Sequence, residues 1–113
     1  MRRMTFIPTV GAPDVADDAI ILDVREPDEW SAGHAPGAVH VPLMDLPARL
    51  GDLPDVDGAT LAVVCRSGGR SSRAVAWLAQ QGYAVSNLDG GMRAWAAAGK
   101  PMVSERGSEP AVL

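Results

Sequence analysis

The most informative stretch of the chain runs from Leu61 to Gln81 and reads LAVVCRSGGRSSRAVAWLAQQ. Its first five residues, Leu61 to Cys65, form an apolar run typical of a strand that is covered on both faces. A polar, glycine-containing loop follows, and from Ser71 to Gln81 apolar residues recur at helical spacing, with Gly82 in the position of a C-cap. A buried strand, a tight loop and a helix are the parts of a βαβ unit, which predicts a parallel sheet.

Shorter segments on either side repeat this alternation. The further predicted strands are 20–24, 39–41 and 84–88, and the further predicted helices are 27–32, 44–50 and 91–98. We therefore expect a three-layer α/β/α domain with a mainly parallel central sheet of four to five strands. We assign residues 1–103 to this single domain and expect residues 104–113, which are polar and rich in helix breakers, to form a flexible C-terminal tail.

The composition fits one soluble domain and excludes several classes of protein. The chain has 113 residues, of which 47% are hydrophobic and 21% charged, as in ordinary globular domains. No apolar run approaches the ~20 residues of a bilayer-spanning helix. The apolar segment near the start is too short for a signal-peptide core, so we expect a cytoplasmic protein with no membrane partner. The net charge of −4 argues against a nucleic-acid partner bound by bulk electrostatics.

The chain has one cysteine, Cys65, which excludes an internal disulfide, a CxxC redox pair and a multi-thiolate zinc site. A lone cysteine without further context is most often a small buried hydrophobe. Here, however, it stands where the predicted strand ends, and ligands of open α/β sheets bind beyond the carboxyl ends of the strands. The glycine pair that follows lets several N–H groups point at one place, toward which the next helix also directs its positive end. We therefore predict that Cys65 is a thiolate nucleophile.

Basic residues gather around this thiol, although the chain as a whole is acidic. Residues 58–88 contain Arg66, Arg70 and Arg73 but none of the 14 acidic residues. Positive charges and N–H donors lower the pKa of a thiol, and the same groups would bind an anionic substrate. The interpretation requires an ionised sulfur atom that solvent can reach, and a protonated or sealed thiol would contradict it.

Four segments, in order along residues 20–101, carry recognisable motifs. They are CRSGGRS at 65–71, LDVREPDEW at 22–30, GHAPGA at 33–38 with Val41-Pro42, and LDGGM at 88–92 with Trp95. The first resembles the active-site loop of rhodanese-like sulfurtransferases. The others resemble that family's D-V-R-E-x-x-E-[WF], G-H-I-x-G-A-x-x-[IV]-P and L-x-G-G-x-x-x-W segments, with Ala35 where isoleucine is common. Together they indicate a member of that family.

The resemblance implies a rhodanese-like fold and a cycle of sulfur transfer. Cys65 would attack the outer sulfur of a donor, in the first place thiosulfate, and become a persulfide, which a thiol or cyanide acceptor or an acceptor protein would then discharge. The resemblance implies that backbone N–H groups cradle the donor anion, namely those of Arg66, Ser67, Gly68, Gly69, Arg70 and Ser71. Arg66 and Arg70 would hold its oxyanion by charge-assisted hydrogen bonds. No cofactor is implied.

Two other functions stay open for the same loop. Cysteine phosphatases and arsenate reductases also hold a thiolate in an anion-binding loop, but with C-x5-R spacing, whereas Cys65 and Arg70 stand in C-x4-R spacing with no Asp or Glu in or beside the loop. A non-catalytic or regulatory rhodanese-like interaction module is the other alternative.

Asp23 and Arg25 end a predicted strand near the loop, and we expect them to support the site, either as structural braces or as direct participants. His34 and His40 lack the spacing of metal ligands, so no metal site is expected.

Overall fold

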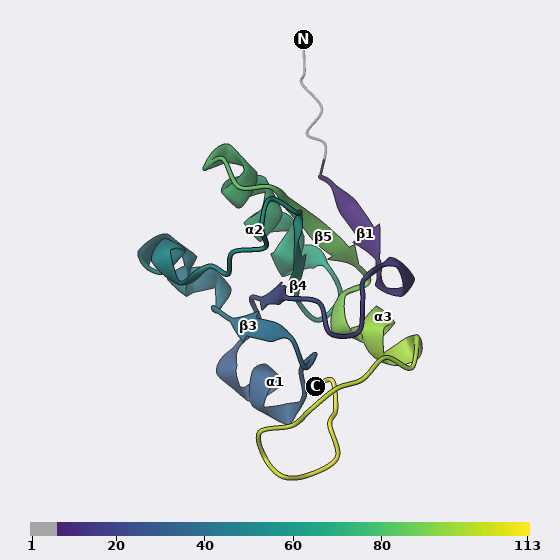
Figure 1. Ribbon diagram of the computed structural model, residues 1–113. Coiled ribbons are helices and arrows are strands. Elements are labelled where there is room, and N and C mark those ends of the chain that lie inside the picture. Colours follow the sequence, from purple (N-terminus) through teal and green to yellow (C-terminus); the bar gives the residue numbers. More distant parts are fainter. Residues whose placement is uncertain (1–6) are drawn as a thin grey trace.

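A computed structural model describes residues 7–113 of the chain, and it contains one fully parallel sheet (Figure 1). The five strands lie in the order β1-β5-β4-β2-β3. Their bounds are Thr9–Gly11 for β1, Ile21–Asp23 for β2, Ala38–His40 for β3, Leu61–Val64 for β4 and Val85–Asp89 for β5. The expected domain also includes residues 1–6, which lie outside the described residues.

Helices connect the strands, which confirms the predicted α/β class with a parallel sheet. The α-helices are α1 at Pro27–Ala32, α2 at Gly69–Gln80 and α3 at Gly91–Ala97. Three short 3₁₀ helices are η1 at Ala12–Asp14, η2 at Leu43–Ala48 and η3 at Leu50–Asp52. The predicted helix at 44–50 is therefore wrong in type, since Pro47 lies inside it and cannot donate to an α-helical ladder. Within residues 7–113, no helix is long and apolar enough to cross a membrane.

Side chains of β4 and the residue after it alternate between two separate hydrophobic cores, one on each face of the sheet. Leu61, Val63 and Cys65 belong to the core that α2 covers. Ala62 and Val64 point the other way, into the core that contains residues of α3. This period of two is the ordinary consequence of strand geometry. It places Cys65 on the face of the sheet that α2 covers.

All five strands point the same way, so the connections that leave their carboxyl ends gather at one edge of the sheet. Asp23 at the end of β2 is in register with Val64 at the end of β4 and with His40 at the end of β3. The loop that begins at Cys65, the turn into α1 and the turn into α3 therefore lie at this edge, as expected for a ligand-binding edge of an α/β sheet.

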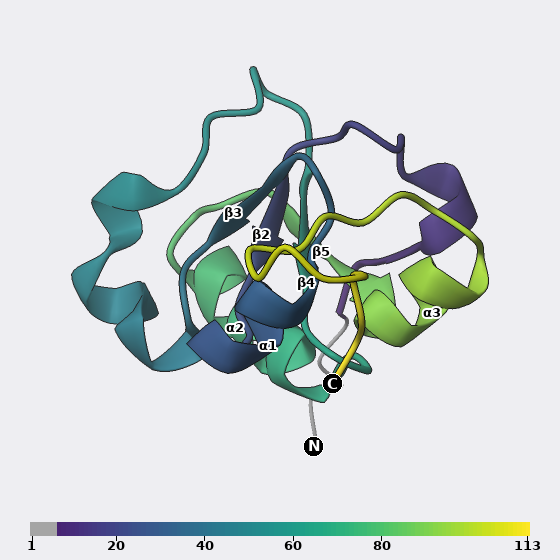
Figure 2. The same cartoon turned by 90° about the horizontal axis from the view of Figure 1, so that it is seen from below.

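The C-terminal segment, residues 104–113, packs against α1 instead of fraying (Figure 2). The N–H groups of Glu105 and Ala111 donate to the carbonyl oxygens of Ser31 and Ala32, at 3.0 and 2.9 Å. A side chain at Gly33 would meet the Ala111 backbone at 2.7 Å, so glycine is what allows the close approach. The expectation of a flexible tail rested on polarity and helix breakers and did not include these backbone hydrogen bonds.

Candidate active site

The sulfur of Cys65 lies within a ring of hydrogen-bond donors. Strand β4 ends at Val64, so Cys65 is the first residue of the loop rather than the last of the strand. Its Sγ accepts hydrogen bonds from the Gly68 N–H at 3.1 Å and from the Ser71 hydroxyl at 3.3 Å. Gly68 has a φ of 116°, in the left-handed region that glycine adopts at little cost, and this conformation starts α2 directly behind the loop.

Burial and hydrogen bonding act on this thiol in opposite directions. Burial raises the pKa of Cys65, but hydrogen bonds from the Ser71 hydroxyl and from the N–H groups of Ser71, Gly68 and Ser67 outweigh it. The net effect is a pKa below the ordinary value of a cysteine. Neutral donors of the loop, rather than the arginine charges stressed by the sequence pattern, are thus the main causes of the lowering.

The resting loop covers the thiol almost completely. Cys65 is only 1% exposed, so the requirement for a sulfur atom that solvent can reach is not met in this conformation. In the loop that follows, Arg66, Ser67 and Gly69 are exposed. Direct attack by this sulfur on a substrate therefore requires a rearrangement of the residues around it.

The start of α3 holds the beginning of the loop. The N–H of Met92 donates to the carbonyl oxygen of Cys65 at 2.8 Å, and that of Arg93 donates to the carbonyl oxygen of Arg66 at 3.0 Å. Gly91 makes this approach feasible, because a Cβ there would lie 2.5 Å from both carbonyl oxygens and its φ is 61°. The turn at 88–92 is thereby tied to the loop at 65–71.

Both loop arginines have partners elsewhere in the chain. Arg66 is exposed, and its Nε donates to the carbonyl oxygen of Leu113 at 2.6 Å. Arg70 forms a two-pronged ion pair with Glu29 of α1, at 2.7 and 2.8 Å. The pair holds the pKa of Glu29 well down, at about 2, and raises that of Arg70. Although the sequence has no Asp or Glu in or beside the loop, the fold brings the carboxylate of Glu29 from α1 to Arg70.

Asp23 and Arg25 form a buried brace. Both side chains are fully buried, and the guanidinium meets the carboxylate at 2.7 to 3.1 Å while also donating to the carbonyl oxygen of Gly33 at 2.7 Å. No hydrogen bond between either side chain and Cys65 is present in the described part of the chain. This geometry favours the bracing role over a direct one.

Asn87 of β5 is a neighbour of the site that the sequence analysis missed. Its Oδ1 lies 2.5 Å from the Ser71 hydroxyl oxygen and competes with the Sγ of Cys65 for the single hydroxyl proton, and its Nδ2 donates to the carbonyl oxygen of Gly68 at 3.3 Å. An amide side chain between the apolar ends of the predicted strand 84–88 is the signal that could have found it. Ser71 and Asn87 together support the back of the loop.

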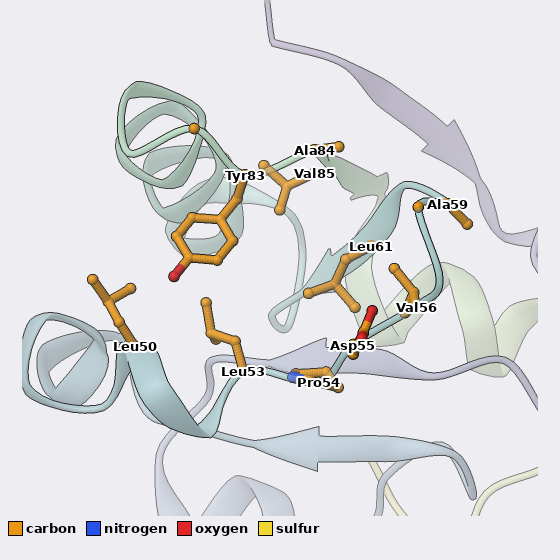
Figure 3. A pocket seen from close by; sticks show the side chains of 12 residues that line it. Leu50, Leu53, Pro54, Asp55, Val56, Ala59, Leu61, Tyr83, Ala84 and Val85 are labelled. Carbon is orange, nitrogen blue, oxygen red and sulfur yellow. The ribbon is translucent and has the colours of Figure 1, made fainter.

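A separate cavity lies far from this chemistry. It has a volume of about 400 Å³ and is lined by residues such as Leu53, Leu61, Tyr83 and Val85 (Figure 3). Leu61 and Val85 begin β4 and β5, so the cavity lies at the amino edge of the sheet, opposite the Cys65 loop. Since its lining holds no thiol and no histidine, we take the Cys65 loop as the candidate site.

A single thiol lies within an amide-lined loop at the carboxyl edge of a parallel sheet. This arrangement defines an α/β protein with a cysteine in an anion-binding loop. The chain belongs to the rhodanese-like domain family, whose pattern it matches over residues 11–98.

Similar proteins agree with this assignment. A sulfurtransferase of Allochromatium vinosum is 42% identical over 93 residues, which cover 80% of this chain and 84% of that protein. The thiosulfate sulfurtransferase GlpE of Pseudomonas entomophila is 37% identical over 81 residues, covering 71% of this chain and 72% of that one. The crystal structure of a rhodanese-related protein from Thermoplasma volcanium has a TM-score of 0.75 at 30% identity, covering 85% of this chain and 97% of that one.

Proposed function

We propose that this protein is a sulfurtransferase that moves a sulfane sulfur from thiosulfate, or a similar donor, to a thiol or cyanide acceptor. The observation that carries the proposal is the Sγ of Cys65, which accepts from the Gly68 N–H and the Ser71 hydroxyl. Such donors stabilise a thiolate, and they would equally stabilise the negative charge of a persulfide. The relatives named as sulfurtransferases support the same reaction class.

The proposed cycle has two steps. The Cys65 thiolate attacks the outer sulfur of the donor, a new S–S bond forms, and the old one breaks so that its electron pair leaves with sulfite. The acceptor then attacks the outer sulfur of the persulfide and restores the thiolate. Free N–H groups of the loop would hold the charge in both steps. Because Cys65 is 1% exposed, the first step also requires the loop to open.

The direct test is the intact mass of the protein after incubation with thiosulfate. We expect a gain of one sulfur atom that cyanide removes as thiocyanate, and no gain in Cys65→Ser. The control is Ser72→Ala, which alters a hydroxyl of the same helix with no hydrogen bond to the sulfur within residues 7–113. A wild-type protein that never carries sulfur, or a Cys65→Ser variant that keeps full turnover, would rule out the mechanism.

The buried thiol favours one second candidate, a rhodanese-like interaction module without turnover. In that case a binding partner would be retained by Cys65→Ala, and no donor would load the protein with sulfur. Alkylation separates the two functions further. A transferase loop must open often enough for a small reagent such as iodoacetamide to modify Cys65 in the folded protein.

A further inference from the structure

The net positive charge beside the Cys65 loop is smaller than its arginines alone imply, because a carboxylate pairs with Arg70. Arg70 lies in the first turn of α2, directly after the loop, and both terminal nitrogens of its guanidinium donate to the carboxylate of Glu29, at 2.7 and 2.8 Å. Fork-to-fork pairing of this kind is the strongest geometry of an arginine with a carboxylate. The pair carries no net charge, so Arg70 adds little positive potential for an incoming anion.

Glu29 is fixed in this position by its own helix. Its Oε1 also accepts the N–H of Glu26 at 3.0 Å, which forms the capping box at the start of α1. Its side chain is only 13% exposed, against 34% for that of Arg70. The carboxylate is therefore a built part of the loop's surroundings rather than a mobile surface group.

A neutralised Arg70 affects sulfur donors according to their charge. Thiosulfate carries two negative charges and must approach an anionic sulfur, so its binding depends on nearby positive charge. An organic thiosulfonate offers the same outer sulfur with one negative charge and needs less compensation. Resting on the proposed sulfurtransferase function, we propose that Glu29 is a specificity-determining residue, which disfavours dianionic donors and favours donors of lower charge by neutralising Arg70.

The chemistry of the transfer is the same for both kinds of donor. The Cys65 thiolate attacks the outer sulfur, the S–S bond of the donor breaks, and the electron pair leaves with sulfite from thiosulfate or with a sulfinate from a thiosulfonate. No oxidant or reductant is required. A change in the preference between the two donors therefore reports on charge at the site and not on a change of reaction.

The test compares kcat/KM for thiosulfate and for the methanethiosulfonate anion, with cyanide as acceptor, in wild type and Glu29→Gln. Glutamine keeps an oxygen for the Glu26 N–H but loses the charge that neutralises Arg70. We expect the ratio of thiosulfate to methanethiosulfonate to rise about tenfold, equivalent to ~1.4 kcal/mol, mainly through a lower KM for thiosulfate. An unchanged ratio in the folded variant would overturn the proposal.

Asp28→Asn is the matched control, since it removes the same charge from an exposed position of the same helix. In Asp28→Asn, the ratio of kcat/KM for thiosulfate to that for methanethiosulfonate should stay within about twofold of wild type. An equal rise of this ratio in Asp28→Asn and Glu29→Gln would overturn the specific role of Glu29. If Glu29→Gln does not fold, Glu29→Asp provides the test, because its shorter side chain cannot keep both contacts to Arg70. We expect a smaller rise there, and no rise would count against the proposal. Failure of wild type to take sulfur from either donor would instead overturn the sulfurtransferase function itself, and this inference with it.

Discussion

Removal of the Ser71 hydroxyl should raise the pKa of Cys65. This hydroxyl is the largest of the hydrogen-bonding influences that lower that pKa, and burial of the sulfur, which raises it, would remain in Ser71→Ala. A hydrogen bond to a charged group contributes ~1.5–3 kcal/mol. We take the lower end because the single hydroxyl proton also faces Oδ1 of Asn87, at 2.5 Å. At ~1.36 kcal/mol per factor of ten, the thiolate population below the pKa falls about tenfold.

The assay is the rate of iodoacetamide alkylation as a function of pH, because only the thiolate reacts. We expect Ser71→Ala to react about tenfold more slowly than wild type at low pH and at the same rate once both thiols are fully ionised. Convergence at high pH separates a change of pKa from a change of loop opening, which would slow the reaction at every pH. Ser72→Ala should match wild type throughout. A profile of Ser71→Ala that superimposes on the wild-type profile would refute the reasoning.

Three further outcomes follow from the brace, the α3 turn and the ion pair. Asp23→Ala leaves the fully buried Arg25 unpaired and should lower the free energy of unfolding by ~3–5 kcal/mol in a denaturant titration; a loss below ~1 kcal/mol would contradict the bracing role. Gly91→Ala puts a Cβ 2.5 Å from the loop carbonyls at a φ of 61°, so it should cost at least ~1–2 kcal/mol and reduce sulfur transfer even at temperatures where the variant is folded; turnover equal to wild type would argue against the tie between α3 and the loop. The pKa of Glu29 is about 2 in the folded chain against an ordinary 4.5, so its pairing stabilises the fold above pH 4.5 and loses this effect as pH falls toward 2. Between pH 4.5 and pH 2, the free energy of unfolding should therefore fall less steeply in Glu29→Gln than in wild type. Identical slopes of that free energy against pH would contradict the lowered pKa of Glu29.

Most of the fold was predictable because its signals are local. The apolar run at 61–65 and the helical spacing after Ser71 predict β4 and α2 to within two residues. Strand β1 was not predicted because Thr9–Gly11 contains only one apolar side chain, Val10, and the strand is stabilised by pairing with β5, far along the chain. The packing of 104–113 on α1 escaped for the same reason, since its hydrogen bonds are formed by backbone groups that any sequence would offer.

The sequence was enough to predict the cysteine and the hydrogen-bond donors around it, but not the carboxylate that neutralises Arg70. Cys65 and the donors of its loop are neighbours in sequence, so spacing alone brings them together. Glu29 and Arg70 are 41 positions apart, and a search for acidic residues along the loop could not detect a carboxylate that another helix supplies. Asn87, which supports Ser71 from β5, is 16 positions away from its partner and escaped in the same way.

The position of β1 has a consequence for how the chain is completed during synthesis. This strand leaves the ribosome before the rest of the sheet, yet its one partner in the sheet is β5, which ends at Asp89. The central part, β2 with β3 and β4, can assemble earlier, whereas β1 must wait until the chain has emerged as far as Asp89. Among the five described strands, the first to be translated is thus among the last to pair in the native sheet.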